Sequence, residues 1–158
     1  FEVLRARELV ESAVAFEAAR LADARHLERL DAVLRDMENG RHPSPETISC
    51  DRRFHVGVAE ILGNAVMVRF VGELFDQRMT PYFERLSTYF ENRESWRLAH
   101  GEHVAVRDAI RAGDAEAASA AMRFHLQTSQ ERFQCSFGEG SAIGEGGGVP
   151  PTVRRTAG

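Results

Sequence analysis

Apolar residues recur at spacings of three and four along most of the chain, which is the spacing that places side chains on one face of an α-helix. In the first 25 residues one such stripe, interrupted by Arg7, consists of Val3, Val10, Val14, Ala18 and Leu21. A second stripe stops at Asn39-Gly40, a pair typical of a helix C-terminus, and consists of Leu27, Leu30, Val33, Leu34 and Met37. The pattern therefore predicts two helices before residue 41.

The same spacing continues to about residue 133. A turn at residues 41–45 precedes a third helix, expected over residues 45–62 and ending at Gly63-Asn64. Residues 65–90 are rich in apolar and aromatic side chains, and Pro81 is expected to kink or divide this fourth helix. The last two helices, 94–112 and 114–133, are joined at Gly113-Asp114 as an antiparallel hairpin. Because no strand alternation is visible, the sequence predicts an all-α fold, an antiparallel bundle of six or seven helices.

Length and composition favour one globular domain followed by a tail. The bundle is expected to span residues 1–137, and residues 138–158, rich in glycine and proline, are expected to be a disordered tail. Because the chain begins at Phe1 and enters a helical pattern at once, we expect a preceding segment in a longer protein. The sequence has neither an apolar run of transmembrane length nor a secretion signal, so a cytoplasmic protein without membrane contact is expected.

The charge of the chain bears on its partners. Its net charge is −4, with 24 acidic against 20 basic residues, whereas binding to nucleic-acid phosphates needs a clustered positive surface. Any DNA contact is therefore expected to lie outside this segment.

Four side chains of the types that bind metals fall on predicted inward faces. Asp51 and His55 are four residues apart on the third helix and therefore point the same way. On the fifth helix His103 belongs to the apolar stripe, whereas His100 aligns with arginines on the opposite, solvated side. On the sixth helix His125 also lies in the apolar stripe. A carboxylate and three imidazoles are thus expected inside the bundle.

The predicted hairpin brings two of these histidines to the same height. His103 lies ten residues before Gly113 and His125 lies twelve after it, so at ~1.5 Å rise per residue they are roughly 15 and 18 Å from the turn. Three imidazoles and one carboxylate suit a divalent metal such as Zn, Ni, Fe or Mn. The other interpretation is that these are hydrogen-bonded core residues, since an aspartate and a histidine four residues apart also form a simple side-chain hydrogen bond.

Arg7 is a further polar residue in a predicted apolar stripe, and a buried guanidinium needs an anion. It could form an internal ion pair, for which Glu11 is available, or extend its head to the surface. It could also clamp a ligand carboxylate near the metal through two parallel hydrogen bonds. Asn64, after Gly63, is accounted for as a helix cap, with an effector contact in a polar pocket as the alternative.

The order of these motifs resembles that of the FCD domain, the C-terminal domain of FadR-type regulators in the GntR superfamily. The resemblance covers about residues 1–133. The matching segments are Arg7-Glu8-Leu9-Val10-Glu11, Asp51-Arg52-Arg53-Phe54-His55, Gly63-Asn64, Glu102-His103, Ala109-Ile110-Arg111-Ala112-Gly113-Asp114 and Met122-Arg123-Phe124-His125-Leu126. Each segment alone is a weak indication of the family, but six of them in the family's order make a specific match.

The resemblance implies an α-helical, homodimeric domain preceded by a winged helix-turn-helix that reads an operator. It also implies a metal held at the positions of Asp51, His55, His103 and His125, and a small carboxylate effector, an organic or sugar acid, that completes the coordination sphere. The arginine at the position of Arg7 helps to hold this effector in such members. The FadR branch that binds acyl-CoA without this metal set is a poorer match, because all four ligand positions are filled here.

These features predict a sensing domain of a DNA-binding transcription regulator rather than an enzyme. A metal-dependent helical-bundle enzyme is the first alternative, since open metal positions could activate water. Against it, no spare general base is expected beside the ligands, because Glu102 points about 100° away from its neighbour His103. The second alternative is a metal-free dimerisation module whose polar core is structural.

Overall fold

The structure, a computed structural model of the 158-residue chain, describes residues 2–40, 44–77 and 92–141, with the side chains of these residues up to 132. Every regular element in these ranges is an α-helix. The helices are α1 (Glu2–Leu21), α2 (Ala24–Asn39), α3 (Pro45–Glu60), α4 (Ala65–Asp76), α6 (Arg93–Ala112) and α7 (Ala115–Ser141). The all-α fold predicted from the sequence is confirmed.

Polar caps set where the helices begin. Asp23 before α2, Ser44 before α3 and Asn92 before α6 each accept a hydrogen bond from the backbone amide three residues further on, which satisfies one of the free amides of the first turn. Gly113 ends α6 with a φ of 69°, a left-handed conformation that glycine adopts without steric cost. The carboxylate of Asp114 then caps α7. The predicted hairpin boundary at Gly113-Asp114 is therefore confirmed.

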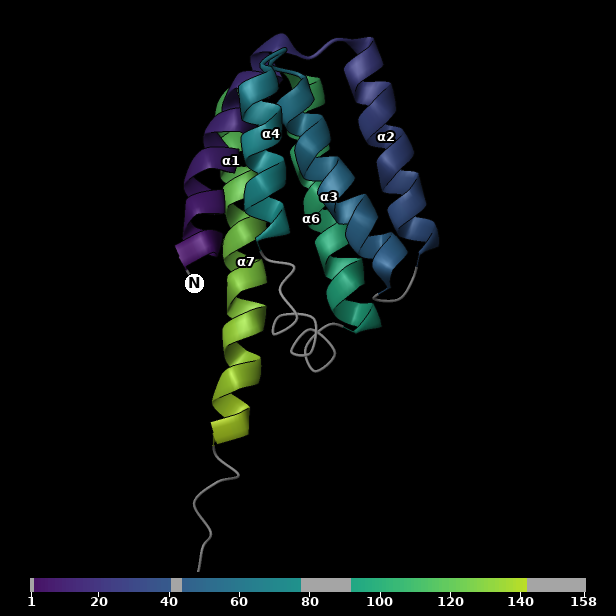
Figure 1. Ribbon diagram of the computed structural model, residues 1–158. Coiled ribbons are helices and arrows are strands. Elements are labelled where there is room, and N and C mark those ends of the chain that lie inside the picture. The colour runs from purple at the N-terminus through teal and green to yellow at the C-terminus, as the bar shows by residue number, and fades with distance from the viewer. Residues whose placement is uncertain (1, 41–43, 78–91, 142–158) are drawn as a thin grey trace, which may run out of the picture.

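Successive described helices run in opposite directions, so that α1, α3 and α6 rise and α2, α4 and α7 descend in the view of Figure 1. The long helix α7 packs along α1 and against α6, and α2 lies on the outer side against α3 and α6. Helix α3 also contacts α1 and α4. The helices that carry the predicted ligands, α3, α6 and α7, thus share one interior.

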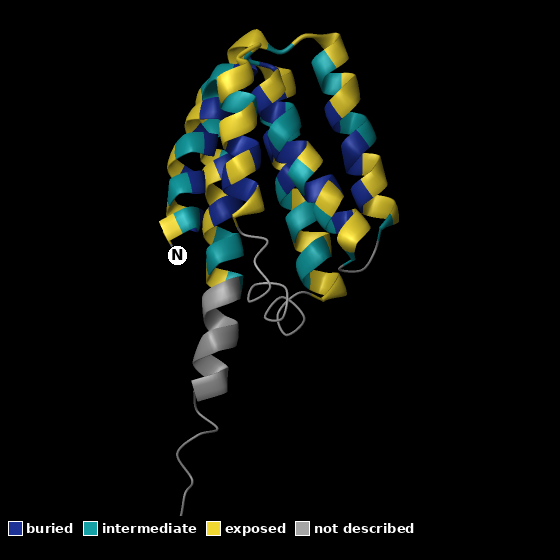
Figure 2. Ribbon diagram, viewed as in Figure 1, coloured by how far each residue is buried: buried dark blue, intermediate teal, exposed yellow. Residues whose placement is uncertain are grey.

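The buried residues lie on the helix faces that point toward one another (Figure 2). The largest of them are less than 2% exposed and include Phe54, Phe75, Leu30, Ile110, Met122 and Leu126. Dense packing of such side chains excludes water from the interior. Any polar group placed among them must find its partners inside the protein.

Some sequence-based expectations concern residues outside the described ranges. The kink or division expected at Pro81 lies in residues 78–91, which the structure does not describe. Within the described residues, α4 ends at Asp76. The last helix ends at Ser141 rather than near residue 133. Most of the predicted tail, residues 142–158, lies outside the described residues. Within those residues no helix is both long and apolar enough to cross a membrane.

We expect Leu30→Ala to lower the free energy of unfolding by about 2–5 kcal/mol, because it removes a side chain that is 1% exposed from the centre of the core. Leu21→Ala is the matched control, since Leu21 is 53% exposed, and it should change stability by no more than about 0.5 kcal/mol. Urea unfolding followed by circular dichroism measures both. Equal losses in the two variants would contradict the packing described here.

Candidate metal centre

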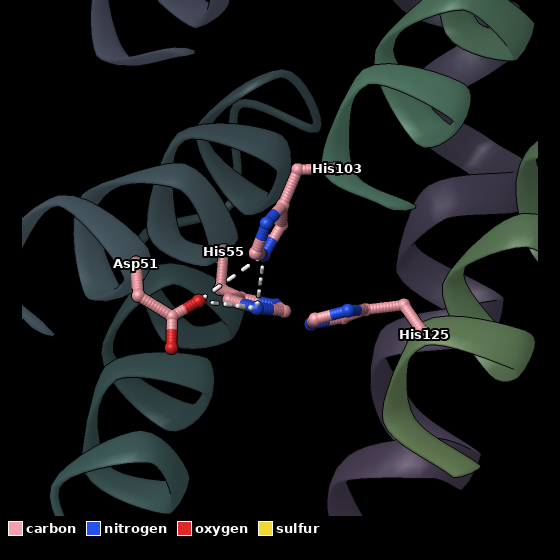
Figure 3. A group of neighbouring side chains, drawn as sticks. All are labelled: Asp51, His55, His103 and His125. Atoms are coloured by element: carbon pink, nitrogen blue, oxygen red, sulfur yellow. Dashed lines mark hydrogen bonds and ion pairs between the residues drawn. The ribbon is translucent and has the colours of Figure 1, made fainter. Parts of the chain in front are cut away.

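Asp51, His55, His103 and His125 meet inside the bundle (Figure 3). Asp51 and His55 come from α3, His103 from α6 and His125 from α7, and all four are buried. Each offers one ligand atom, and these four atoms lie within 4.8 Å of one another. The convergence predicted from helical spacing and hairpin geometry is therefore present in the structure.

Three of the four side chains converge closely. The Oδ1 atom of Asp51 is 3.3 Å from Nε2 of His55 and 3.1 Å from Nε2 of His103. The two Nε2 atoms are 3.3 Å apart. The ring of His125 extends toward them, with its centroid 5.2 Å from that of His55 and 4.2 Å from that of His103.

Two carboxylates hold the outer nitrogens of two of these rings. Nδ1 of His55 is 2.5 Å from Oε2 of Glu11, and Nδ1 of His125 is 2.8 Å from Oε2 of Glu102. A carboxylate only accepts, so each of these Nδ1 atoms carries the hydrogen. In the neutral imidazoles Nε2 is then left with a lone pair directed into the cluster. Carboxylate–histidine pairs of this kind orient the imidazole ligands of metals.

The electrostatics favour ionised carboxylates beside neutral imidazoles at two of the three histidines. Although burial by itself raises the pKa of Glu11, the positive partners Arg7 and His55 bring it to about 2. Burial lowers the pKa of His103, and burial together with the charge of His103 lowers the pKa of His125 to about 3. For His55 burial also acts downward, but the negative charge of Glu11 outweighs it and raises the pKa.

The carboxyl of Asp51 is held in its ionised form in the same way. Burial raises its pKa, but hydrogen bonds from His103 and His55 outweigh burial and bring the pKa well below its usual range. An ionised carboxylate and uncharged imidazoles are the forms in which these groups bind a metal.

The residues present fit a divalent metal ion. The Nε2 atoms of His55 and His103 both face Oδ1 of Asp51, so a cation bound among these three atoms would replace the protons that otherwise join them. Three imidazoles and one carboxylate match the preference of Zn, Ni, Fe and Mn. Both outer carboxylates needed to orient the rings are also in place.

Arg7 lies deep beside this cluster. Its side chain is 1% exposed, and its Nε donates to Oε1 of Glu11 over 2.6 Å. Its guanidinium carbon lies 4.7 Å from the centre of the Phe75 ring. Among the residues that the structure describes, neither terminal nitrogen of Arg7 has a hydrogen-bond partner. The ion pair with Glu11 considered from the sequence is present, and two donor groups of the arginine are left over for another anion.

The remaining predicted site residue lies at a helix end. Asn64 is exposed, and its Oδ1 accepts from the backbone amides of Val66 and Met67 at the start of α4. The helix-cap interpretation of Asn64 is therefore confirmed. Its contact with an effector stays a prediction.

Two sequence-based placements were wrong. His100 was expected on a solvated face, but it is half-buried, with Nε2 3.2 Å from the carbonyl oxygen of Leu34, because α2 covers that side of α6. Glu102 was expected to point away from the ligands. It does diverge from His103, but the neighbouring helix α7 brings His125 within reach of it. Reasoning within one helix could not show a contact made between two helices.

Glu102 is in turn held by an arginine, as Glu11 is. Arg132 on α7 donates to both oxygens of Glu102, over 2.8 and 3.0 Å. Burial raises the pKa of Glu102, but His125 and Arg132 bring it to about 2. Spacing along the sequence indicated Glu11 as a partner of Arg7, which stands four residues before it, but no such signal links residue 102 to residue 132.

Comparison with known protein families shows to which family the chain belongs. The FCD domain matches residues 2–128, about four-fifths of the sequence. The chain belongs to the FCD domain family. This confirms the resemblance found in the sequence motifs.

Several curated relatives of this FCD chain are regulators of transcription. It is 29% identical to the Uxu operon regulator of Haemophilus influenzae, over 80% of the chain and 48% of that protein. It is 31% identical to the putative L-lactate dehydrogenase operon regulatory protein of Escherichia coli K12, over 84% and 52%. It is 30% identical to the HTH-type transcriptional repressor NanR of Enterobacter, over 89% and 52%. The chain spans about half the length of these relatives, each of which is named as a regulator or a repressor.

A solved structure shares the fold. The E. coli protein McbR/YncC superposes with a TM-score of 0.76 over 86% of this FCD chain and 64% of that chain, at 17% sequence identity. McbR/YncC and the present chain thus share the helical-bundle fold.

We expect His125 to carry its hydrogen on Nδ1, because Glu102 accepts from that atom. Long-range ¹H–¹⁵N spectra of the metal-free protein at neutral pH measure the tautomer directly. His100, whose Nε2 donates to the carbonyl oxygen of Leu34, should show the opposite tautomer and is the internal control. A hydrogen on Nε2 of His125 would contradict the arrangement described here.

Proposed function

We propose that this chain is the ligand-sensing, dimerising domain of a DNA-binding transcription regulator. It binds a divalent metal ion and a small carboxylate effector, and the effector modulates operator binding. The observation that carries the proposal is the buried cluster of one carboxylate and three imidazoles beside an arginine whose two terminal nitrogens have no hydrogen-bond partner among the described residues. This juxtaposition supports a site in which the cluster binds the metal and Arg7 binds the anion.

Four side chains would hold the metal. Asp51, His55, His103 and His125 supply one ligand atom each, and four protein ligands leave room for a further ligand on a metal that accepts five or six. When bound, the metal supplies a Lewis-acidic positive charge that attracts a carboxylate oxygen. Glu11 and Glu102 hold two of the rings in the orientation that metal binding needs.

Arg7 would hold the effector. Its guanidinium is planar and offers parallel donors that match the two oxygens of a carboxylate. Since Glu11 occupies only Nε, both terminal nitrogens are available for this contact. Phe75 lies against the guanidinium and near the ring of His55, so it closes one side of the site with an apolar surface. This favours a small organic or sugar acid over a large ligand.

Effector binding could be transmitted because the site joins four helices. Its residues come from α1, α3, α6 and α7, so a ligand that draws Arg7 and the metal together changes how these helices pack. A ligand controls a protein only through different affinities for two arrangements. In the complete regulator, the two arrangements would place the DNA-binding domains of a homodimer at different spacings. Those domains would lie in a preceding winged helix-turn-helix segment. The matched regulators leave room for such a segment, because this chain spans only about half of their length.

The metal itself provides a first test. We expect about one divalent ion per chain in protein purified without a chelator or a nickel column, and almost none in His103→Ala, since removing one of four ligands weakens binding strongly. His100→Ala is the matched control, because this histidine lies on the same helix outside the cluster. Mass spectrometry of the metal content measures all three proteins.

Circular dichroism shows whether each of these variants is folded. A wild type without metal, even after reconstitution with Zn²⁺, Ni²⁺, Fe²⁺ and Mn²⁺ in turn, would refute the proposal. It would favour the metal-free dimerisation module. Equal metal content in folded His103→Ala and in the wild type would show that the ion binds elsewhere.

The anion site provides a second test. We expect Arg7→Lys to bind a carboxylate about 10- to 100-fold more weakly, because a hydrogen bond to a charged group is worth ~1.5–3 kcal/mol and lysine lacks the planar pair of donors. Lactate, gluconate and succinate are the probes, and thermal shift of the metal-loaded protein is the measurement. Arg5→Lys is the matched control, since Arg5 lies on the same helix and is 58% exposed.

Comparison of the two arginine variants shows whether carboxylate binding depends on the guanidinium of Arg7 or is equally sensitive to an arginine elsewhere on α1. Stabilisation of wild type and Arg5→Lys by one of the three acids, with a much weaker response in Arg7→Lys, supports the clamp. The same response in all three proteins would show that Arg7 does not hold the carboxylate.

A further inference from the structure

We propose that Glu11 couples the metal centre to the anion site, so that each ligand strengthens the binding of the other through this one carboxylate. The inference rests on the proposed function above, because it needs both sites. It assigns Glu11 a positioning role: the residue acts on the metal through His55 and on the anion through Arg7.

The contacts of Glu11 make it a bridge. Its Oε1 accepts from Nε of Arg7 over 2.6 Å, and its Oε2 accepts from Nδ1 of His55 over 2.5 Å. The side chain is 2% exposed and its two partners are no more than 1% exposed. Each carboxylate oxygen therefore serves one partner, and water does not screen the charges.

A continuous series of hydrogen-bonded side chains connects the proposed anion site to the proposed metal site. At one end, the terminal nitrogens of Arg7 are unpaired among the described residues. At the other end, Nε2 of His55 lies 3.3 Å from both Oδ1 of Asp51 and Nε2 of His103. Within the described part of the structure, Glu11 joins these two ends through hydrogen bonds and connects α1 to α3.

The direction of the coupling follows from charge. An anion bound to Arg7 takes up part of the positive charge that otherwise attracts Glu11. Glu11 then accepts more strongly from His55, and a stronger hydrogen bond at Nδ1 makes Nε2 a better electron donor to the metal. By linkage, a bound metal must favour the anion by the same factor.

Glu102 offers a comparison within the same molecule. It holds His125 as Glu11 holds His55, with a separation of 2.8 Å, and it too is paired with an arginine. That arginine is Arg132 on α7, not the buried Arg7 on α1. Both carboxylates should therefore support metal binding, but only Glu11 should transmit the presence of an anion.

The experiment compares wild type, Glu11→Gln and Glu102→Gln, with Zn²⁺ as the metal and acetate as the carboxylate probe. Zinc affinity is measured by competition with a chromophoric chelator, in excess acetate and in chloride of equal ionic strength. Acetate binds free zinc alike in every sample, so the difference between proteins isolates the effect of the site. Circular dichroism checks that each variant is folded.

We expect both variants to bind zinc about 10- to 100-fold more weakly than wild type, as is usual when the partner of a ligating histidine is removed. Acetate should strengthen zinc binding about fivefold or more in wild type and in Glu102→Gln. In Glu11→Gln this gain should be lost. An equal gain in Glu11→Gln would overturn the inference, and so would no gain in a wild type that binds zinc. Absence of zinc binding in the wild type would instead refute the proposed function.

A second measurement does not depend on the folding of a variant. In zinc-loaded, ¹⁵N-labelled wild type, acetate should move the Nδ1 proton of His55 downfield while that of His125 keeps its position. Equal movement of both protons, or movement of His125 alone, would contradict a path through Glu11.

Discussion

The interior of this bundle depends on charges that compensate one another out of contact with water. One carboxylate, Glu11, accepts from a buried guanidinium and from a buried imidazole, and so ties α1 to α3. Without it Arg7 and His55 would each bring a polar group into the core at a cost of several kcal/mol. On the other side of His55, a metal ion between the four candidate ligand side chains would compensate the negative charge of Asp51. The hydrogen bonds that hold α1 against α3 and the candidate metal site therefore belong to one network.

This network explains why polar residues are acceptable at positions where the helical pattern calls for apolar ones. The rest of the core is packed by ordinary apolar side chains, among them Leu30, Ile110 and Leu126. The ligands enter it from three helices, each at a position that faces inward. A site built on the regular parts of helices is held in place by the packing of the bundle rather than by a loop.

Much of the fold and of the candidate site could be predicted from the sequence, because both follow helical periodicity. The stripes and the glycine at position 113 determine most helix boundaries, and equal distances from that turn bring His103 and His125 together. What periodicity cannot show is how neighbouring helices are rotated against each other. The contact of Glu102 with His125, its hydrogen bonds from Arg132 and the cover that α2 gives to His100 all depend on that rotation. The same limit applies to Arg7, for which the sequence left an ion pair and a ligand clamp as alternatives, and the structure shows the ion pair together with two further donors.

The most direct measurement is the anomalous scattering of crystals of the zinc-loaded protein, recorded on both sides of the zinc absorption edge. The account predicts one strong peak inside the bundle, bounded by the Nε2 atoms of His55, His103 and His125 and by a carboxylate oxygen of Asp51. Zinc bound only at surface residues, with these four side chains hydrogen-bonded to one another, would contradict it.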